Sequence, residues 1–118
     1  MTKKASDIID IFAAAMLEQK KLREERESAG VPALLKLVKA AKEGGGQAHH
    51  LRRFLLGLYH SHDWPFELDR LRALDTHLQQ AALQVLALDW NGNEIHTYIE
   101  NGDELFHSWW VREQATRS

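Results

Sequence analysis

The sequence predicts an all-α protein, a compact bundle of five or six short helices. Apolar residues recur three and four positions apart through most of the chain, which is the spacing of one helix face. Glycine and proline clusters interrupt this pattern at intervals and leave short connections. Short connections favour antiparallel packing of neighbouring helices, so we expect a bundle.

The composition indicates one soluble globular domain. The chain has 118 residues, 44% of them hydrophobic, and no cysteine, which excludes disulfides and thiolate metal sites. Asp7 and Asp10 interrupt the first apolar segment, which therefore lacks the apolar core of a signal peptide. No apolar run approaches the roughly 18 residues needed to span a membrane. We expect a cytoplasmic, bacterial protein.

Residues 1–29 are expected to form an N-terminal helix that continues as a charged arm. The first half carries one apolar face, whereas residues 18–28 contain Leu22 as their only large apolar side chain. Such a polar helix depends on weak charge pairs such as Lys20–Glu24. We predict a solvated linker helix, with a partner-docking or oligomerising arm as the alternative. The apolar face comprises Ile8, Ile11, Phe12, Ala15 and Met16.

Residues 30–113 are expected to form the helical domain. Gly30 is expected to end the first helix and Pro32 to begin the second, which runs to about Glu43 before three glycines stop it. A third, central helix follows, with an apolar stripe about 140° wide. The side chains expected to be buried in these two helices are Leu34, Leu35, Val38, Ala41, Leu51, Phe54, Leu55, Leu58 and Tyr59.

Beyond the central helix, Pro65 restricts Trp64 and forces a turn. A short helix containing Leu68 and Leu71 comes next, and Asp75 caps a longer helix from Thr76 to about Asp89. The buried face of that longer helix is expected to consist of Leu78, Ala81, Ala82, Val85 and Leu86.

The segment near residues 88–99 allows two interpretations. Asn91-Gly92 favours a small β-hairpin, but its first strand would unwind the end of a well-patterned helix. We therefore predict an irregular connection, with the hairpin as the alternative. A final helix capped by Asp103 carries Trp109 in the core and Trp110 at a partly exposed edge, and residues 114–118 form a frayed tail.

The chain resembles a small helical domain family of unknown function that occurs in proteobacterial plasmid and integrative-element proteins. The resemblance spans roughly Val31 to Trp110. It implies a helical fold and no catalytic residues. The matching residues are Gly46-Gln47, Arg52 to Leu56, Trp64, Leu68, Leu71, Leu74-Asp75, Leu83, Leu86, Phe106 and Trp110.

The charge is unevenly distributed and suggests two binding surfaces. Residues 31–62 carry an excess of about four positive charges, and residues 63–118 an excess of about six negative ones. A nucleic-acid-binding face would use the basic residues Lys36, Lys39, Lys42, Arg52 and Arg53. A partner-binding surface would use the polar face of the central helix and the last helix, namely His49, Arg52, Arg53, His60 and Trp110.

The histidines at the turn after the central helix raise the question of a metal. His60, His62 and Asp63 have ligand chemistry, but helical positions two apart diverge and no fourth ligand is evident. We expect no metal, no cofactor and no catalytic residue. The predicted function is a non-enzymatic interaction module whose partner is another protein or a second copy, in a homodimer. The resemblance implies a mobile-element accessory role that modulates a host or plasmid system. The alternatives are a nucleic-acid-associated protein and a small metal-dependent enzyme at the His60/His62 turn.

Overall fold

The computed structural model describes residues 4–117, which fold into helices joined by short turns, with no strand in that range. The predicted all-α class is confirmed, and the irregular connection near residues 88–99 is found in place of the hairpin. The elements are α1 (Ala5–Glu43), α2 (Gly46–Tyr59), the 3-10 helix η1 (Leu68–Ala73), α3 (Thr76–Asp89), the 3-10 helix η2 (Ile95–Tyr98) and α4 (Gly102–Arg117).

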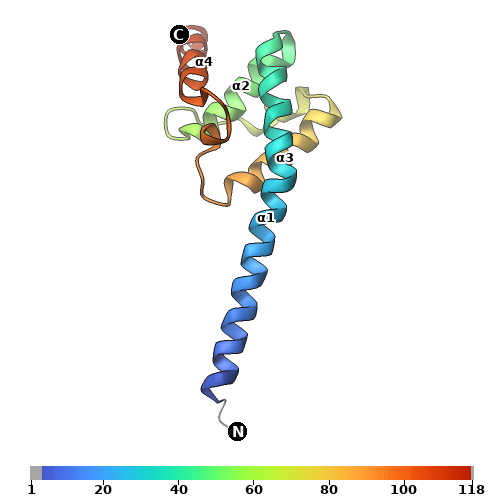
Figure 1. Cartoon of the computed structure of the whole chain (residues 1–118). Helices are drawn as coiled ribbons and strands as arrows, with labels where there is room; N and C mark the ends of the chain where they lie inside the picture. The colour runs from blue at the N-terminus through green and yellow to red at the C-terminus, as the bar shows by residue number, and fades with distance from the viewer. Residues whose placement is uncertain (1–3, 118) are drawn as a thin grey trace.

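Helix α1 runs the whole length of the molecule (Figure 1). Its C-terminal half packs against α3 and α2, while its N-terminal half projects away from the other helices. The molecule is consequently elongated, with extents of 65 × 27 × 27 Å. We call residues 5–25 of α1 the arm, because every side chain in this range is exposed, and the remaining helices with the rest of α1 the body.

The predicted break between Gly30 and Pro32 is wrong, because α1 is continuous through both residues. Gly30 is buried where α3 crosses α1, and a Cβ there would lie 2.6 Å from Leu88 Cβ and 3.1 Å from the Gln84 carbonyl oxygen. Pro32 removes the helical hydrogen bond to the Ser28 carbonyl, at a point of α1 where Ser28 is exposed and Pro32 is half-buried. The close packing of α3 against α1 therefore explains Gly30, which the sequence had indicated as the end of a helix.

Gly30→Ala is expected to lower the free energy of unfolding by about 1–2 kcal/mol, because overpacking against Leu88 outweighs the better helix propensity of alanine. Gly46→Ala is the matched control, since a Cβ at Gly46, in the first turn of α2, meets nothing within 4 Å. Urea denaturation of both variants measures the difference. Equal or higher stability of both variants would contradict a close α1–α3 crossing at Gly30.

Helix α2 lies at the centre of the body and is buried on two faces. The predicted stripe faces the core, with Leu51 and Leu55 fully buried, but Leu56 on another side is fully buried as well. The reason is that α4 covers the side of α2 that the sequence assigned to solvent. Leu35, by contrast, is 50% exposed, so its expected burial is wrong.

Two short segments complete the body. Gly44 and Gly45, with φ of 83° and 91°, end α1 in the conformation that favours glycine.

The predicted tail is helical through Arg117, since α4 continues to that residue. Its last turn is held to the body because the Arg117 guanidinium lies over the Trp64 ring and donates to the Asp63 carbonyl.

Candidate functional site

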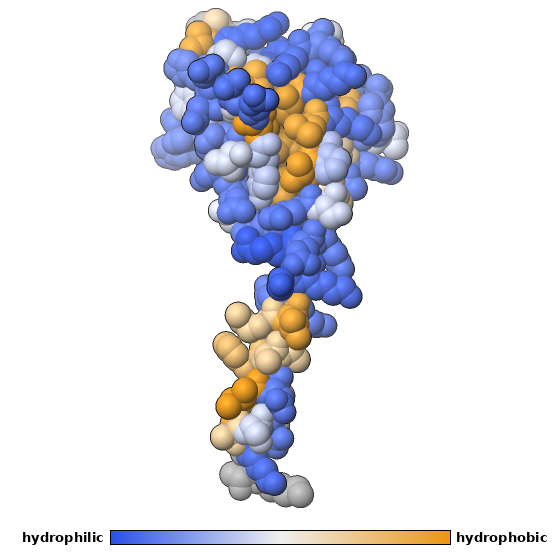
Figure 2. Space-filling view, in the orientation of Figure 1, coloured by the Kyte–Doolittle hydropathy of each residue, from blue (hydrophilic) through white to orange (hydrophobic). Residues whose placement is uncertain are grey.

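The arm exposes a row of large apolar side chains, the feature of this molecule that most suggests a binding surface. Figure 2 shows these side chains gathered on the projecting part of the molecule. Monomeric proteins seldom leave so many together in water. We call them the arm stripe: Ile8, Ile9, Ile11, Phe12, Met16 and Leu22, which are 41–68% exposed.

The arm stripe faces the same side of α1 as the body. At 100° per residue, the arm stripe fills an arc of about 160°, and the buried residues of α1 fill an overlapping arc whose centre differs by about 30°. Those buried residues are Gly30, Ala33, Leu34, Leu37, Val38 and Ala41. The arm therefore presents to solvent the continuation of a surface that is covered by α3 and α2 farther along the helix.

The base of the arm is fixed to the end of α3. The buried side chain of Asn91 donates from Nδ2 to the Arg23 carbonyl at 3.0 Å and accepts from Arg26 Nη1 at 3.3 Å. The Arg26 guanidinium also lies 5.9 Å from the ring centre of Trp90, which is 67% exposed. An exposed tryptophan thus stands beside the base of the arm.

Most of the residues predicted to bind a partner belong to a buried ionic cluster. Glu113 on α4 is fully buried and accepts hydrogen bonds from Arg52 Nε at 2.9 Å and Arg53 Nε at 2.7 Å, and His49 Nδ1 lies 2.7 Å from its Oε1. Arg52 is itself 5% exposed and donates to the Ala41 carbonyl. The structure brings His49, Arg52 and Arg53 together, but around a carboxylate inside the molecule.

The cluster extends from Glu113 to η1 through the histidines. His49 Nδ1 faces Glu113, and His49 Nε2 and His50 Nδ1 each lie 3.2 Å from Arg70 Nη1. Burial, followed by the charges of Arg70 and His49, lowers the pKa of His50. Burial raises the pKa of Glu113, but hydrogen bonds from Arg52 and Arg53 outweigh it, so the pKa lies below its usual value.

Sequence reasoning missed Glu113, although a signal for it was present. Phe106, Trp109 and Glu113 follow one another at helical spacing, and all three are buried. A carboxylate on an apolar helix face needs a buried counter-charge, and adjacent arginines in α2 supply it.

His60 and Trp110, the other two predicted partner-binding residues, lie side by side at the surface. Their rings are 5.6 Å apart at 76°, and His60 Nδ1 is 2.9 Å from Asp63 Oδ2. Trp110 also packs against Tyr59 and Trp64, so one side of it belongs to the core. Trp109 is 4% exposed, which confirms its predicted burial.

The five basic residues predicted as a nucleic-acid face do not form one surface. Lys36, Lys39 and Lys42 are exposed on α1, and Lys39 lies 4.0 Å from Glu43. Arg52 and Arg53 instead direct their charge to Glu113 inside the body. Of this set, only the three lysines present their charge to solvent.

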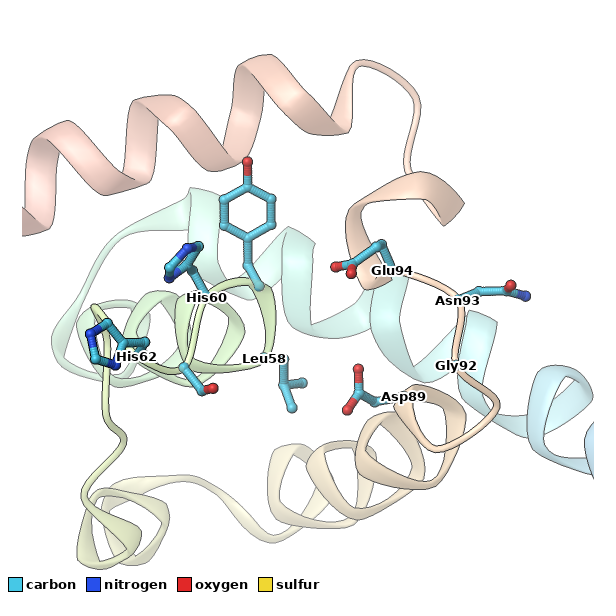
Figure 3. Close-up of a pocket in the computed structure, with 9 residues that line it drawn as sticks. Leu58, His60, His62, Asp89, Gly92, Asn93 and Glu94 are labelled. Carbon is cyan, nitrogen blue, oxygen red and sulfur yellow. The ribbon is translucent and has the colours of Figure 1, made fainter.

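The turn after α2 borders a cavity of about 420 Å³ (Figure 3). His60 and His62 lie on one side of this cavity, and Asp89 and Glu94 lie on the other. Burial, with a contribution from Glu94, raises the pKa of Asp89. Among residues 4–117 no three histidine or acidic side chains lie close enough together to hold a metal ion.

Comparison with known proteins gives one match. Residues 31–114 match the profile of a protein family described as a family of unknown function (DUF7673). No curated protein and no solved structure matches the chain. The matched segment covers the body, whereas the arm lies outside it. Within the described range, no helix has the length and apolar character that crossing a membrane requires.

Proposed function

The chain belongs to this family of unknown function, and we propose that it is a non-enzymatic interaction module that joins a second copy of itself through the arm stripe. The observation that carries the proposal is the row of six apolar side chains, 41–68% exposed, on the exposed part of α1 that projects from the body. Isolated helices gain most of their stability by packing an apolar face, so the arm is expected to have a partner.

The spacing of the arm stripe fits a second helix of the same kind. Ile8, Ala15 and Leu22 are seven residues apart, and Ile11 and Phe12 supply the other seam positions between Ile8 and Ala15. The corresponding positions between Ala15 and Leu22 are the polar residues Glu18 and Gln19. Ala15 is small, and it lies midway between two larger side chains. A second arm can meet this short seam through Ile8, Ile11, Phe12 and Leu22.

The charge of the arm supports self-association. Residues 5–25 carry three basic and five acidic side chains, and the flanking Lys4 and Arg26 bring the total to five of each, so two copies meet without net repulsion over residues 4–26. The six side chains of the arm stripe, each about half exposed, offer roughly 600 Å² per chain. This area approaches the value of about 800 Å² per partner found in stable complexes.

For the biological setting we propose an accessory role in a mobile genetic element, in which the dimer modulates a host or plasmid system. This part of the proposal is supported by the resemblance of residues 31–110 to proteins of plasmids and integrative elements. In that setting the arm would join two bodies, and each body would remain available for a further contact through His60 and Trp110.

Phe12→Glu is expected to convert the dimer to a monomer, because each dimer would then bury two carboxylates in an apolar seam. Sedimentation velocity over a concentration series measures the change. Leu17→Glu is the matched control, since Leu17 is 67% exposed and Phe12 68%, but Leu17 lies about 160° from the centre of the arm stripe. A monomeric wild-type protein, or equal dissociation of both variants, would overturn the proposal.

A further inference from the structure

We infer that the two copies pair with their arms antiparallel, so that the tip of each arm abuts Trp90 on the body of the other. This inference rests on the self-association proposed above and adds its geometry. Three observations carry it: the direction of the arm stripe, the equal spacing of Ile8 and Leu22 from Ala15, and the exposure of Trp90.

The direction of the arm stripe excludes a parallel pair. The body occupies the space in front of the same face of α1 that carries the arm stripe. In a parallel pair joined face to face, both bodies would lie at the same end and on the inner side of helices about 8–10 Å apart. Bodies with transverse extents of 27 Å do not fit into that space. An antiparallel pair places them at opposite ends.

Ile8 and Leu22 lie seven residues on either side of Ala15, and this spacing gives the register. A twofold axis at Ala15 sets Ile8 of each chain opposite Leu22 of the other, so apolar side chains meet at both ends of the seam. The same register brings the tip of each arm, at Lys4, level with Arg26 of the other chain, and the two cationic side chains must point apart. Because the Arg26 guanidinium lies over Trp90, the tip of one arm reaches the tryptophan on the other copy.

The exposure of Trp90 agrees with this contact. Trp90 is 67% exposed at the edge of a cavity of about 310 Å³ that lies between the arm and the end of α3. Met16 and Arg23 of the arm also line this cavity. A partner helix entering it would cover the indole, and an aromatic ring at such a position adds the area that the seam alone lacks.

Engineered cysteines test the orientation, since the chain has no cysteine of its own. Ile8→Cys and Leu22→Cys are prepared separately, unfolded, mixed, refolded together and oxidised, and the products are identified by mass. The expected result is a disulfide between positions 8 and 22 that forms only in the mixture. Disulfides formed by each variant alone would indicate a parallel pair and overturn the inference. A dimer that forms neither product would also overturn it.

The outcomes separate this inference from the proposed function. If the wild-type protein sediments as a monomer, self-association itself is refuted. If the wild-type protein is a dimer that the Phe12→Glu substitution dissociates, self-association stands. If the disulfides in that dimer do not join positions 8 and 22, only the antiparallel geometry fails.

The contact with Trp90 has its own measurement. Trp90→Ala is expected to raise the dimer dissociation constant about tenfold, whereas Val111→Ala, which alters a 58% exposed side chain elsewhere on the body, leaves it unchanged. Equal dissociation constants for the two variants would overturn the contact between the tip and Trp90.

Discussion

Replacing Glu113 with alanine is expected to lower the free energy of unfolding by about 3–5 kcal/mol, the cost of leaving a buried charge without its counter-charge. Arg52 is 5% exposed, and in the variant its guanidinium keeps the Ala41 carbonyl but loses the carboxylate. Arg53 and His49 lose the same acceptor, so α4 loses its main polar attachment to α2. Urea denaturation followed by circular dichroism measures the change.

Two further variants isolate the charge. Glu104→Ala removes an exposed carboxylate from the same helix and should change stability by less than about 0.5 kcal/mol. Glu113→Gln keeps the shape and one acceptor oxygen and should fall between the two alanine variants. If Glu113→Ala and Glu104→Ala were equally stable, the ionic cluster would not hold α4 in place.

The same carboxylate predicts a dependence on pH. The pKa of Glu113 in the folded protein lies below its usual value of about 4.5, because the hydrogen bonds from both arginines outweigh the effect of burial. Its contribution to stability is therefore present above pH 4.5 and is lost as the pH falls through the lower folded-state pKa. The stability difference between wild type and Glu113→Gln should accordingly shrink below pH 4.5.

Local sequence patterns predicted the helix bounds well where nearby residues determine them. The helix Thr76–Asp89 was predicted with its observed bounds, since Asp75 marks its start and regular apolar spacing continues to its end. The glycines after Glu43 end α1 as expected. At Gly30 the same reasoning failed, because the residue permits a close crossing with Leu88, which is distant in the sequence.

Predictions for the candidate site failed for a related reason. The sequence shows that His49 and Arg53 lie opposite an apolar stripe, but it does not show that another helix covers them. Glu113 covers them from α4, 60 residues beyond Arg53, and converts a cationic face into an internal ion pair. The sequence predicted the arm because its amphipathic pattern is visible there. It left two roles open, a solvated linker helix and a partner-docking or oligomerising arm. The apolar face of the arm lies on the same side of α1 as the face that packs against the body. This alignment exists only because α1 is continuous.

Trp109→Ala is expected to lower the free energy of unfolding by about 3–5 kcal/mol, as the removal of a large buried side chain does. Trp109 is 4% exposed and packs against Phe106, whose ring centre is 5.0 Å away. Trp110→Ala should cost less, about 1–2 kcal/mol, because Trp110 is only partly buried, although it touches Trp64 and Tyr59. Thermal and urea denaturation compare the two variants.

The pair of variants also tests where the chain self-associates. From the sequence alone, the exposed edge of Trp110 was a candidate surface for self-association, whereas the arm is the surface proposed from the structure. If the arm carries the interface, Trp110→Ala leaves the sedimentation profile unchanged and Phe12→Glu shifts it to the monomer. If Trp110→Ala dissociates the dimer as strongly as Phe12→Glu does, the interface includes the body beside α4. The antiparallel pairing of arms would then need a second contact, because Trp110 lies against His60 on the body and not on the arm.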